Sequence, residues 1–488
     1  MSAAPTVRHL VLAGCYRDSV ALLALSSELA GLPGVEVASV VMGTPANLER
    51  LADSGLGGVP AGPGDVVVAV RALDEDAALA ALERAQARVR EPVGGSGPGD
   101  PAAIEPVRSL AAAVAADPAI SLAVVSVPGD YAAAEATKAL QLGLHVLLFS
   151  DNVPLADEVA LKQQADRLGL LVMGPDCGTA IVAGVPLGFA NEVRRGPVGV
   201  VGASGTGMQE VTTRLHRAGT GVSHALGVGG RDLSAAVGGR STLAALEVLA
   251  GDTATEVIVL IAKPPDPEVA ERVLRAATAT GRPVVACLLG ADPHRSVPAG
   301  VHAVSTLAAA ADAAVALVAG RAPAYDEPAP APLRRGTRAG TVVRGAFCGG
   351  TFAHEAELLL AAAGVPHEVV DYGDDEYTRG RPHPMIDPAV RDAAAAAALA
   401  DPTTAVVVVD VVLGHGAGPD PLPGLLAAIG ATPGGAPVVA HVCGTDDDPI
   451  PRRAVVAGLH AAGVAVAESN AEAVAWAAAL ADSAGVVT

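Results

Sequence analysis

The chain contains 488 residues, of which 51% are hydrophobic and only 2% aromatic, and it carries a formal net charge of −20. Its length predicts two to four domains, because a single core rarely grows beyond about 250 residues. Binding to a nucleic-acid backbone needs clustered basic side chains, and the only lysines are Lys138, Lys162 and Lys263. Nucleic acid is therefore excluded as a partner.

Neither a membrane span nor a disulfide framework is expected. The longest stretch without an acidic or basic residue, 421–445, contains four prolines that would break a spanning helix. The first residues lead into an apolar run at Leu10, which indicates a first strand rather than a signal peptide. Five widely spaced cysteines, an odd number, fit a reducing compartment. We therefore expect a cytoplasmic protein.

Short apolar strands alternate with alanine-rich helical stretches along nearly the whole chain. This pattern is typical of helices that cross between parallel strands, and it predicts the α/β fold class. The predicted strands, in chain order, are Leu10–Ala13, Val66–Val70, Leu122–Val127, Val146–Ser150, Leu170–Met173, Val198–Gly202, Val257–Ala262, Val284–Leu289, Val342–Phe347, Val406–Leu413 and Val438–Val442.

Segments rich in glycine and proline divide the chain. Linkers are predicted at 91–100 and, as the stronger boundary, at 321–340, and a weaker boundary lies near 194–197. Three units follow, which span 1–193, 197–320 and 341–488. The second and third units follow a related logic, since each opens with a strand that ends in a glycine-rich turn, although one sequence alone does not prove a repeat.

Two turns in the first half of the chain carry chemically useful groups. Asp176 and Cys177 lie in a sharp turn after a strand, and the thiol is either reactive or merely small and apolar. Gly229 and Gly230 follow a short strand in a glycine-rich segment, which is a candidate backbone nest for an anion.

The sharpest local signal is the segment 198–210, VGVVGASGTGMQE. A buried strand runs into a turn rich in glycine and hydroxyl groups and then into a helix, so free backbone N–H groups and the helix dipole face whatever lies above the turn. The segment predicts an anion site at Ser204, Gly205, Thr206 and Gly207. The alternative is a hydroxyl N-cap with glycines that tighten the connection. It is neither a Walker A loop nor a complete dinucleotide fingerprint.

The densest polar cluster is DYGDDEYTRGRPHPMIDP, at 371–388. Its acidic side chains could bind a metal or act as general bases, whereas Arg379 and Arg381 could clamp a carboxylate or a phosphate. The alternative is a solvated loop that its prolines stiffen. Polar density between two apolar stretches favours function.

Two further turns lie in the last unit. Gly414, His415 and Gly416 follow a strand at its carboxyl end, where open α/β sheets place ligands. His415 could donate to an anion or act as a base, although a surface histidine without such a role is commoner. The acidic run 446–448 could bind a cation or be solvated. No metal site is predicted, because zinc-ligand spacings are missing, and so is the Gly-x-Ser-x-Gly elbow of lipases.

Several segments, taken in order, resemble the FdrA family, which is related to the α subunit of succinyl-CoA synthetase. The motifs that carry the resemblance are MGTPANL at 42–48, MGPDCGT at 173–179, VGVVGASGTGMQE at 198–210, GVGGRDL at 227–233 and DYGDDEYTRGRPHPMIDP at 371–388. The resemblance covers essentially the whole chain. It implies a Rossmann-like, CoA-binding-type domain, then a flavodoxin-like ligase domain of the synthetase α type, then a second ligase-type domain similar to the C-terminal domain of the synthetase β subunit.

In the synthetase family, two helix N-termini face each other and hold the phosphate of a phosphohistidine. The resemblance implies that 204–206 form the α-side turn, that Glu210 steadies the histidine, and that Gly414 and Gly416 belong to the β-side turn. The loop where a Gly-His-Ala-Gly motif is expected follows the strand 284–289, and its histidines stand outside such a motif.

The resemblance also implies a chemistry. FdrA-type proteins resemble a component of oxamate carbamoyltransferase in ureide nitrogen catabolism, which acts with partner proteins. Carbamoyl phosphate or phosphate would then occupy the anion site, while Arg379, Arg381 and His383 hold or polarise the acceptor, oxamate. One alternative is an ADP-forming acid–CoA ligase of the acyl-CoA synthetase type, which binds CoA and needs a separate nucleotide-binding subunit. Another is a non-catalytic scaffold or regulatory subunit. Heteromeric partner subunits or a homo-oligomer are expected.

Overall fold

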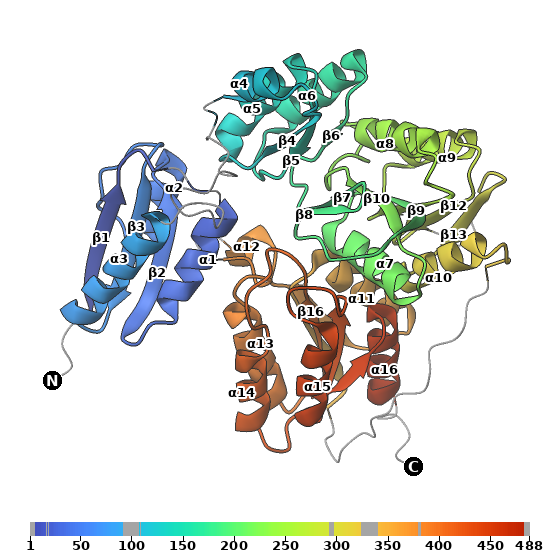
Figure 1. Ribbon diagram of the computed structural model, residues 1–488. Helices are drawn as coiled ribbons and strands as arrows, with labels where there is room; N and C mark the ends of the chain where they lie inside the picture. Colours follow the sequence, from blue (N-terminus) through green and yellow to red (C-terminus); the bar gives the residue numbers. More distant parts are fainter. Residues whose placement is uncertain are drawn as a thin grey trace, which may run out of the picture.

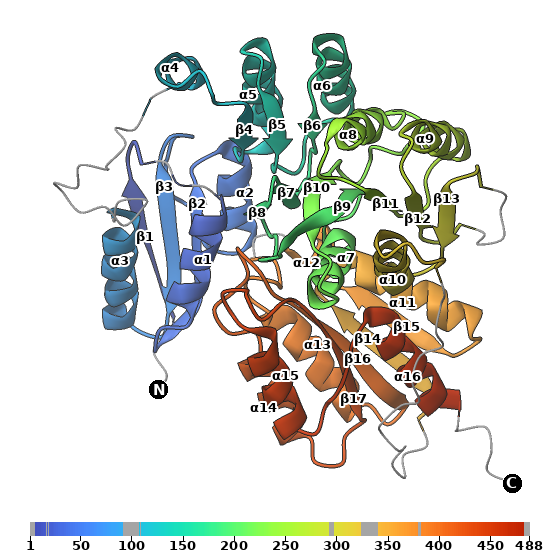
Figure 2. The ribbon, with the colours of Figure 1, turned by 45° about the vertical axis from the view of Figure 1, so that its right-hand side comes forward.

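Four β-sheets with flanking helices make up the computed structural model (Figures 1 and 2). The structure describes residues 5–15, 17, 19–90, 107, 109–291, 297–323, 340–378 and 382–482. The first predicted linker and most of the second fall outside these residues. No helix in the described part of the chain is long and apolar enough to cross a membrane.

The first unit is an antiparallel sheet, drawn in blue in Figure 1. Strand β3 (Val66–Ala72) lies between β1 (Thr6–Leu12) and β2 (Val35–Met42) and runs antiparallel to both. Apolar side chains of α1 (Ser19–Ala30) and α3 (Glu75–Arg90) cover one face. The other face packs against Leu51 of α2 (Pro45–Asp53) and Leu56.

This arrangement differs from the parallel sheet that the sequence predicts for the beginning of the chain. It is a split βαβ unit, in which a third strand is inserted between two parallel ones. Alternation of strands and helices is the same in a split and in an ordinary βαβ unit, so the sequence pattern does not distinguish them. The predicted unit 1–193 therefore contains two separate sheets rather than one.

A small parallel sheet follows, in the order β4-β5-β6. Its strands are β4 (Leu122–Val125), β5 (His145–Leu148) and β6 (Val172–Met173), and its helices are α4 (Leu110–Ala116), α5 (Gly129–Gln141) and α6 (Leu155–Leu168). The buried alanines of α5 pack against the strands, as expected for crossover helices.

The next sheet has seven strands in the order β13-β12-β11-β9-β10-β7-β8. The five parallel strands are β9 (Arg195–Gly202), β10 (Val222–Gly227), β11 (Val257–Ala262), β12 (Val284–Leu288) and β13 (Val301–Val304), with α7 (Gly205–Arg217), α8 (Arg240–Gly251), α9 (Pro267–Ala279) and α10 (Leu307–Val318) around them. The hairpin of β7 (Thr179–Val182) and β8 (Val185–Gly188) joins the edge at β10. This hairpin belongs to the second unit, although the sequence places its residues in the first.

The last sheet has the order β15-β14-β16-β17-β18, and all of its strands are parallel. Its elements are β14 (Val342–Phe347), α11 (Gly350–Ala362), β15 (His367–Asp371), α12 (Asp375–Thr378), α13 (Ala389–Ala400), β16 (Thr404–Val412), α14 (Pro423–Ala431), β17 (Val438–Cys443), α15 (Arg452–Ala461), β18 (Ala465–Ala467) and α16 (Asn470–Asp482).

The parallel strands of the second and third units have the same order. Numbered within each unit, both run 2-1-3-4-5, which is the flavodoxin-like arrangement. This confirms the predicted pair of flavodoxin-like domains with parallel sheets. One apolar core joins the two units, because α7 packs against α10 of its own unit and against α11 of the other.

Candidate functional site

The first strand of each flavodoxin-like unit leads into a helix whose N-terminus meets its counterpart. β9 ends at Gly202 and α7 begins at Gly205, while β14 ends at Phe347 and α11 begins at Gly350. Both loops lie where the strand order reverses, which is where open α/β sheets bind ligands. At the meeting point, the Ser204 and Thr351 hydroxyl oxygens are 2.5 Å apart.

On the α7 side, a serine and a glycine fix the turn. Ser204 is the N-cap, and its Oγ accepts a hydrogen bond of 3.0 Å from the Gly207 N–H. A Cβ on Gly207 would lie 2.5 Å from that oxygen, so only glycine fits there. Because the cap takes the Gly207 donor, the free amides at this end of the helix are those of Gly205 and Thr206.

On the α11 side, a buried carboxylate does the equivalent work. Asp410 accepts hydrogen bonds from the amides of Cys348 (2.6 Å) and Gly349 (2.8 Å). These two donors precede the helix, and α11 itself has no side-chain cap, so its first amides, those of Gly350 and Thr351 among them, remain free. Four backbone donors thus converge from two helix dipoles, an arrangement that favours a small anion.

A cleft of about 990 Å³ opens above this junction and is lined by residues of three of the four sheets and by loop residues that follow β4 and β5 of the remaining sheet. Ser204, Thr206 and Thr351 line it on one side, and Thr44 and Arg50 of the first unit line it on another. Among the described residues, its charged lining consists of six aspartates and three cations: Asp130, Asp151, Asp176, Asp371, Asp374, Asp375, Arg50, Arg231 and Lys263. The rim is therefore acidic, and the positive end of the cleft is at the helix N-termini.

Two aspartates of the cleft have raised pKa values. Burial, together with repulsion from Asp151 and Asp375, raises the pKa of Asp176 to about 6. Burial and the charge of Asp410 raise the pKa of Asp371 to about 6. A Cβ on Gly350 would be 2.3 Å from Asp371 Oδ2 and 3.6 Å from Lys263 Nζ, so both groups stand beside the free amides.

His383 and Lys263 complete the polar lining near α11. Burial lowers the pKa of His383 to about 4, and its Nδ1 accepts a 3.2 Å hydrogen bond from the Met385 amide. The imidazole is therefore neutral at physiological pH and can donate from Nε2. Lys263 is exposed to the cleft and has no hydrogen-bond or ion-pair partner among the described residues, so it is free to bind a carboxylate or a phosphate oxygen.

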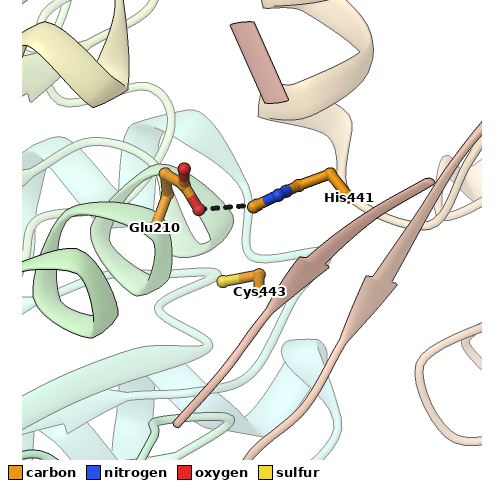
Figure 3. Close-up of side chains that lie close together, drawn as sticks. All are labelled: Glu210, His441 and Cys443. Carbon is orange, nitrogen blue, oxygen red and sulfur yellow. Dashed lines mark hydrogen bonds and ion pairs between the residues drawn. The ribbon is translucent and has the colours of Figure 1, made fainter. Parts of the chain in front are cut away.

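Behind the junction lies a buried ion pair between the two units. Glu210 Oε2 of α7 and His441 Nε2 of β17 are 2.7 Å apart, and both side chains are fully buried (Figure 3). Burial by itself raises the pKa of Glu210, but the charge and hydrogen bond of His441 outweigh that effect and lower it to about 2. Cys443, also buried, lies beside the pair.

A second buried glutamate occupies the matching position of α11. The two helices begin with the same pattern, Gly-Thr-x-x-x-Glu, at 205–210 and at 350–355. Glu355 accepts hydrogen bonds of 2.8 Å from the Leu307 amide and from the Asn470 side chain. Burial raises its pKa to about 7, with Glu210 contributing repulsion. This pattern was available in the sequence and identifies the second turn, 348–351, which the motif search missed.

The structure gathers most of the predicted site residues at the cleft. Ser204, Gly205, Thr206, Asp176, Cys177, Gly229, Gly230 and His383 line it. Gly207 and Glu210 lie behind this surface, on α7. Arg379 and Arg381 fall outside the described residues.

The predicted β-side turn lies elsewhere. The His415 amide donates to Ala190 O, and its ring pairs with Glu192 at 2.8 Å. A Cβ on Gly416 would touch the Phe189 ring, so this loop packs against 189–192 instead of facing Ser204. The turns after β14 and after β16 both follow the carboxyl end of a strand, but only the turn after β14 lies at the switch point, where the strand order reverses.

The structure also decides two further predicted groups, Cys177 and Asp448. Burial raises the pKa of Cys177 to about 12, so the thiol is not reactive at physiological pH. Asp448 accepts hydrogen bonds from Asn191, from the Glu192 amide and from the Thr445 amide, which leaves little capacity for the suggested cation.

The glycine-rich segment after β10 is held by a buried charge network. Lys162 Nζ donates to Glu158 (2.9 Å), to the Val228 carbonyl (3.0 Å) and to Asp232 (2.8 Å). Asp232 also accepts from the Thr242 amide near the start of α8. The network fixes the position of Gly229 and Gly230 at the cleft and ties the β4-β5-β6 unit to the seven-stranded sheet.

Comparison with known families defines the class of protein. Three family models match the chain: "AllF, heavy metal-associated domain" at 5–101, "CoA binding domain" at 193–290 and "CoA-ligase" at 346–480. Together with the fold, these matches show a protein with CoA-binding and ligase-type domains. The CoA-binding match falls on the second predicted unit, whereas the resemblance implies it for the first.

The chain belongs to the family of YahF, an uncharacterized protein of Escherichia coli K12. The two are 38% identical over an alignment of length 488, and this alignment covers 91% of this chain and 92% of YahF. The α subunit of the ADP-forming succinate–CoA ligase of Methanothermobacter thermautotrophicus is 30% identical over 148 residues, 29% of this chain and 48% of the subunit. The chain thus matches about half the length of that subunit.

A solved structure has a weaker likeness. It is the dinucleotide-forming acetyl-coenzyme A synthetase 1 of Ca. Korarchaeum cryptofilum, in complex with phosphate and ADP, with 16% identity and a TM-score of 0.33 over 75% of this chain and 83% of that one.

The metal in the name of the first family model has no ligand set among the described residues of the β1-β3-β2 sheet and its helices. Among the described residues, the only histidine, cysteine and carboxylate side chains grouped closely enough to hold an ion are Glu210, His441 and Cys443, far along the chain. Cys15 is the single cysteine of the first unit.

Proposed function

We propose that this chain is the phosphate-handling part of a ligase-type acyl-transfer enzyme. The observation that carries the proposal is the 2.5 Å contact between Ser204 and Thr351, which brings four free amides of two helix N-termini to one point. Such a site binds the phosphoryl group of an acyl phosphate, or inorganic phosphate, through donors that need no reorganisation. The nucleotide-dependent step is assigned to a separate subunit.

The residues beside the junction have matching roles in this proposal. Lys263 binds a carboxylate or phosphate oxygen, and neutral His383 donates a hydrogen bond to the acyl carbonyl. Asp371, with a pKa of about 6, is partly protonated near neutral pH and can accept the proton of an incoming nucleophile in its ionised form.

CoA is the acyl acceptor that the family models suggest, and the cleft fits it only in part. A volume of about 990 Å³ is sufficient for a large ligand. The rim, however, carries Asp130, Asp151 and Asp176, which disfavour the phosphates of CoA, while Arg50 is a cation that would favour them.

This acidic rim favours a second candidate function. In carbamoyl transfer of the FdrA type, carbamoyl phosphate would bind at the helix N-termini and the carboxylate of the acceptor, such as oxamate, at Lys263. Both substrates are small, so neither needs the rim. Carbamoyl transfer would use the same anion site as acyl transfer to CoA, and the two functions differ in the acceptor.

One assay distinguishes the candidates. The purified chain is given an acyl-CoA with phosphate, and separately carbamoyl phosphate with oxamate, each with and without co-purified partner subunits. Phosphate-dependent release of the CoA thiol supports the ligase reading, and oxamate-dependent phosphate release supports carbamoyl transfer. A chain that binds phosphate without either reaction, in every combination, would be a binding subunit and would overturn both.

The site itself is tested by calorimetric titration with inorganic phosphate. Gly350→Ala places a Cβ 2.3 Å from Asp371 Oδ2 and is expected to lower the phosphate affinity by at least about tenfold. Gly430→Ala is the matched control, because the added Cβ in α14 would meet no atom within 4 Å. Equal phosphate affinity in the two variants would refute the site.

A further inference from the structure

The three side chains of Figure 3 form a sealed group between two domains. Glu210 comes from α7, and His441 and Cys443 come from the same face of β17, two residues apart. One nitrogen, one oxygen and one sulfur atom of these residues lie within 4.8 Å of one another, and all three side chains are fully buried. The group lies outside the cleft and plays no part in the proposed function.

Two polar atoms in this group have no hydrogen-bond partner. Glu210 uses Oε2 for His441, but its Oε1 is buried and unpartnered, and so is the Nδ1 of His441. A buried polar atom left without a partner costs about 1–3 kcal/mol. Two such atoms beside a buried thiol are a feature that the ion pair by itself does not explain.

The matching position in the second unit supplies an internal comparison. The strand registers place Cys287 of β12 where the third unit has His441, and Cys287 lies close to Glu355. There, both carboxylate oxygens of Glu355 have donors, the Leu307 amide and the Asn470 side chain. Of two equivalent buried glutamates, one is fully partnered, and the other has one oxygen paired with a histidine beside a cysteine and one oxygen without a partner.

An imidazole, a thiolate and a carboxylate are together the ligand set of a borderline divalent ion such as Zn²⁺. Glu210 and Cys443 as anions with a neutral His441 would balance the charge of a divalent ion, and an electrically neutral cluster is suited to full burial. Zinc-ligand spacing is missing from the sequence because the ligands come from separate domains, 231 residues apart in the case of Glu210 and His441.

We propose that Glu210, His441 and Cys443 form an interdomain site for a zinc-class transition-metal ion. On binding, the Cys443 thiol loses its proton to solvent, and His441 binds as the neutral imidazole. The ion links α7 to β17 directly behind the helix N-termini and so holds the two flavodoxin-like units together. Three protein ligands leave one position of a tetrahedral ion for the second Glu210 oxygen or for a water.

The test uses the full chain, first stripped with a chelator and then titrated with Zn²⁺ or Co²⁺. We expect one ion per chain, a rise in the melting temperature, and with Co²⁺ a thiolate-to-metal charge-transfer absorption. Cys443→Ser is expected to remove that absorption and to weaken Zn²⁺ binding by about 100-fold or more. Cys287→Ser is the matched control and leaves both unchanged.

The readouts do not depend on enzyme activity or on anion binding. Wild-type chain that takes up no ion, or that binds Co²⁺ without a thiolate absorption, would overturn the proposal even if no variant folds. A Co²⁺ spectrum that survives in Cys443→Ser but disappears in Cys287→Ser would also overturn it. If neither titration changes the chain, Glu210 and His441 are an ion pair only.

Discussion

The two flavodoxin-like units share a strand order and a sequence pattern at the start of their first helix, yet the backbone amides there find different partners. The second unit caps its first helix with the Ser204 hydroxyl, whereas in the third the carboxylate of Asp410 accepts from two amides that precede the helix. The amides of Gly205 and Thr206 stay free beside the cap, and those of Gly350 and Thr351 stay free on a helix that has no side-chain cap. Two related domains thus contribute to one anion site, while the glutamates behind it differ: both oxygens of Glu355 have partners, and one oxygen of Glu210 has none.

The largest expected effect concerns the buried charge network of Lys162; the third unit has a buried ion pair of its own, Arg391 with Asp392. Lys162→Met leaves Asp232 buried without its cation and Glu158 with Arg231 alone, so we expect a loss of about 3–5 kcal/mol in the free energy of unfolding. Lys138→Met, on an exposed ion pair with Glu135, should cost less than about 1 kcal/mol. Urea denaturation of both variants measures the contrast, and equal losses would contradict it.

The two buried glutamates should respond differently to neutralisation. Glu210→Gln breaks a fully buried ion pair with His441 and is expected to cost about 3 kcal/mol. Glu355→Gln removes less charge, because the pKa of Glu355 is about 7, but the new amide nitrogen would face one of the two donors, so we expect a loss of about 1–2 kcal/mol. Both are measured by urea denaturation in the presence of a chelator. A larger loss for Glu355→Gln would reverse the comparison.

The two turns should differ in how they tolerate an added methyl group. In Gly350→Ala the Cβ would lie 2.3 Å from Asp371, whereas in Gly205→Ala it would lie 3.2 Å from Thr179 Oγ1. We expect a loss of phosphate affinity of at least about tenfold for the first variant and a smaller loss for the second. Calorimetric titration ranks them, and equal affinities would show that the α11 side is not part of the site.

The smallest expected effect is a pH dependence of anion binding. The pKa of Asp371 is raised to about 6, so the group is neutral below that pH and charged above it. Affinity for sulfate, whose charge is constant from pH 5 to pH 8, should therefore fall by up to about tenfold as the pH rises through 6. The raised pKa of Asp371 also lowers the free energy of unfolding as the pH rises from about 4 to about 6, because the folded state binds more protons than the unfolded state over this range.

In Asp371→Asn, we expect the affinity for sulfate to remain high above pH 6, where the wild-type affinity falls. Asp176 has a similarly raised pKa and leaves a residual slope. A wild-type profile that rises with pH would contradict the assignment of either group.

Much of the architecture follows from the sequence, because long parallel strands are nearly continuous apolar runs with recognisable turns. The strand β9 and the turn at Ser204 were found in this way. The orientation of the first sheet was not, since a split βαβ unit has the same order of strands and helices along the chain. The position of β3 between β1 and β2 is decided by packing of α1 and α3 on one face.

The site was only half predictable for a similar reason. The turn before α11 repeats the Gly-Thr-x-x-x-Glu pattern and could have been found by comparing the units. Carboxyl ends of several strands, however, meet at one sheet edge, and the sequence does not say which loop stands at the switch point. Likewise, nothing local in the sequence pairs Glu210 with His441, because their contact depends on how two domains dock.

Binding of an anion by amides of two helix N-termini is tested most directly by a crystal structure of the full chain grown with phosphate. We expect a phosphate within hydrogen-bond distance of the amides of Gly205, Thr206, Gly350 and Thr351, next to the Ser204 and Thr351 hydroxyls. A phosphate bound elsewhere in the cleft, with these amides bonded only to water, would contradict it.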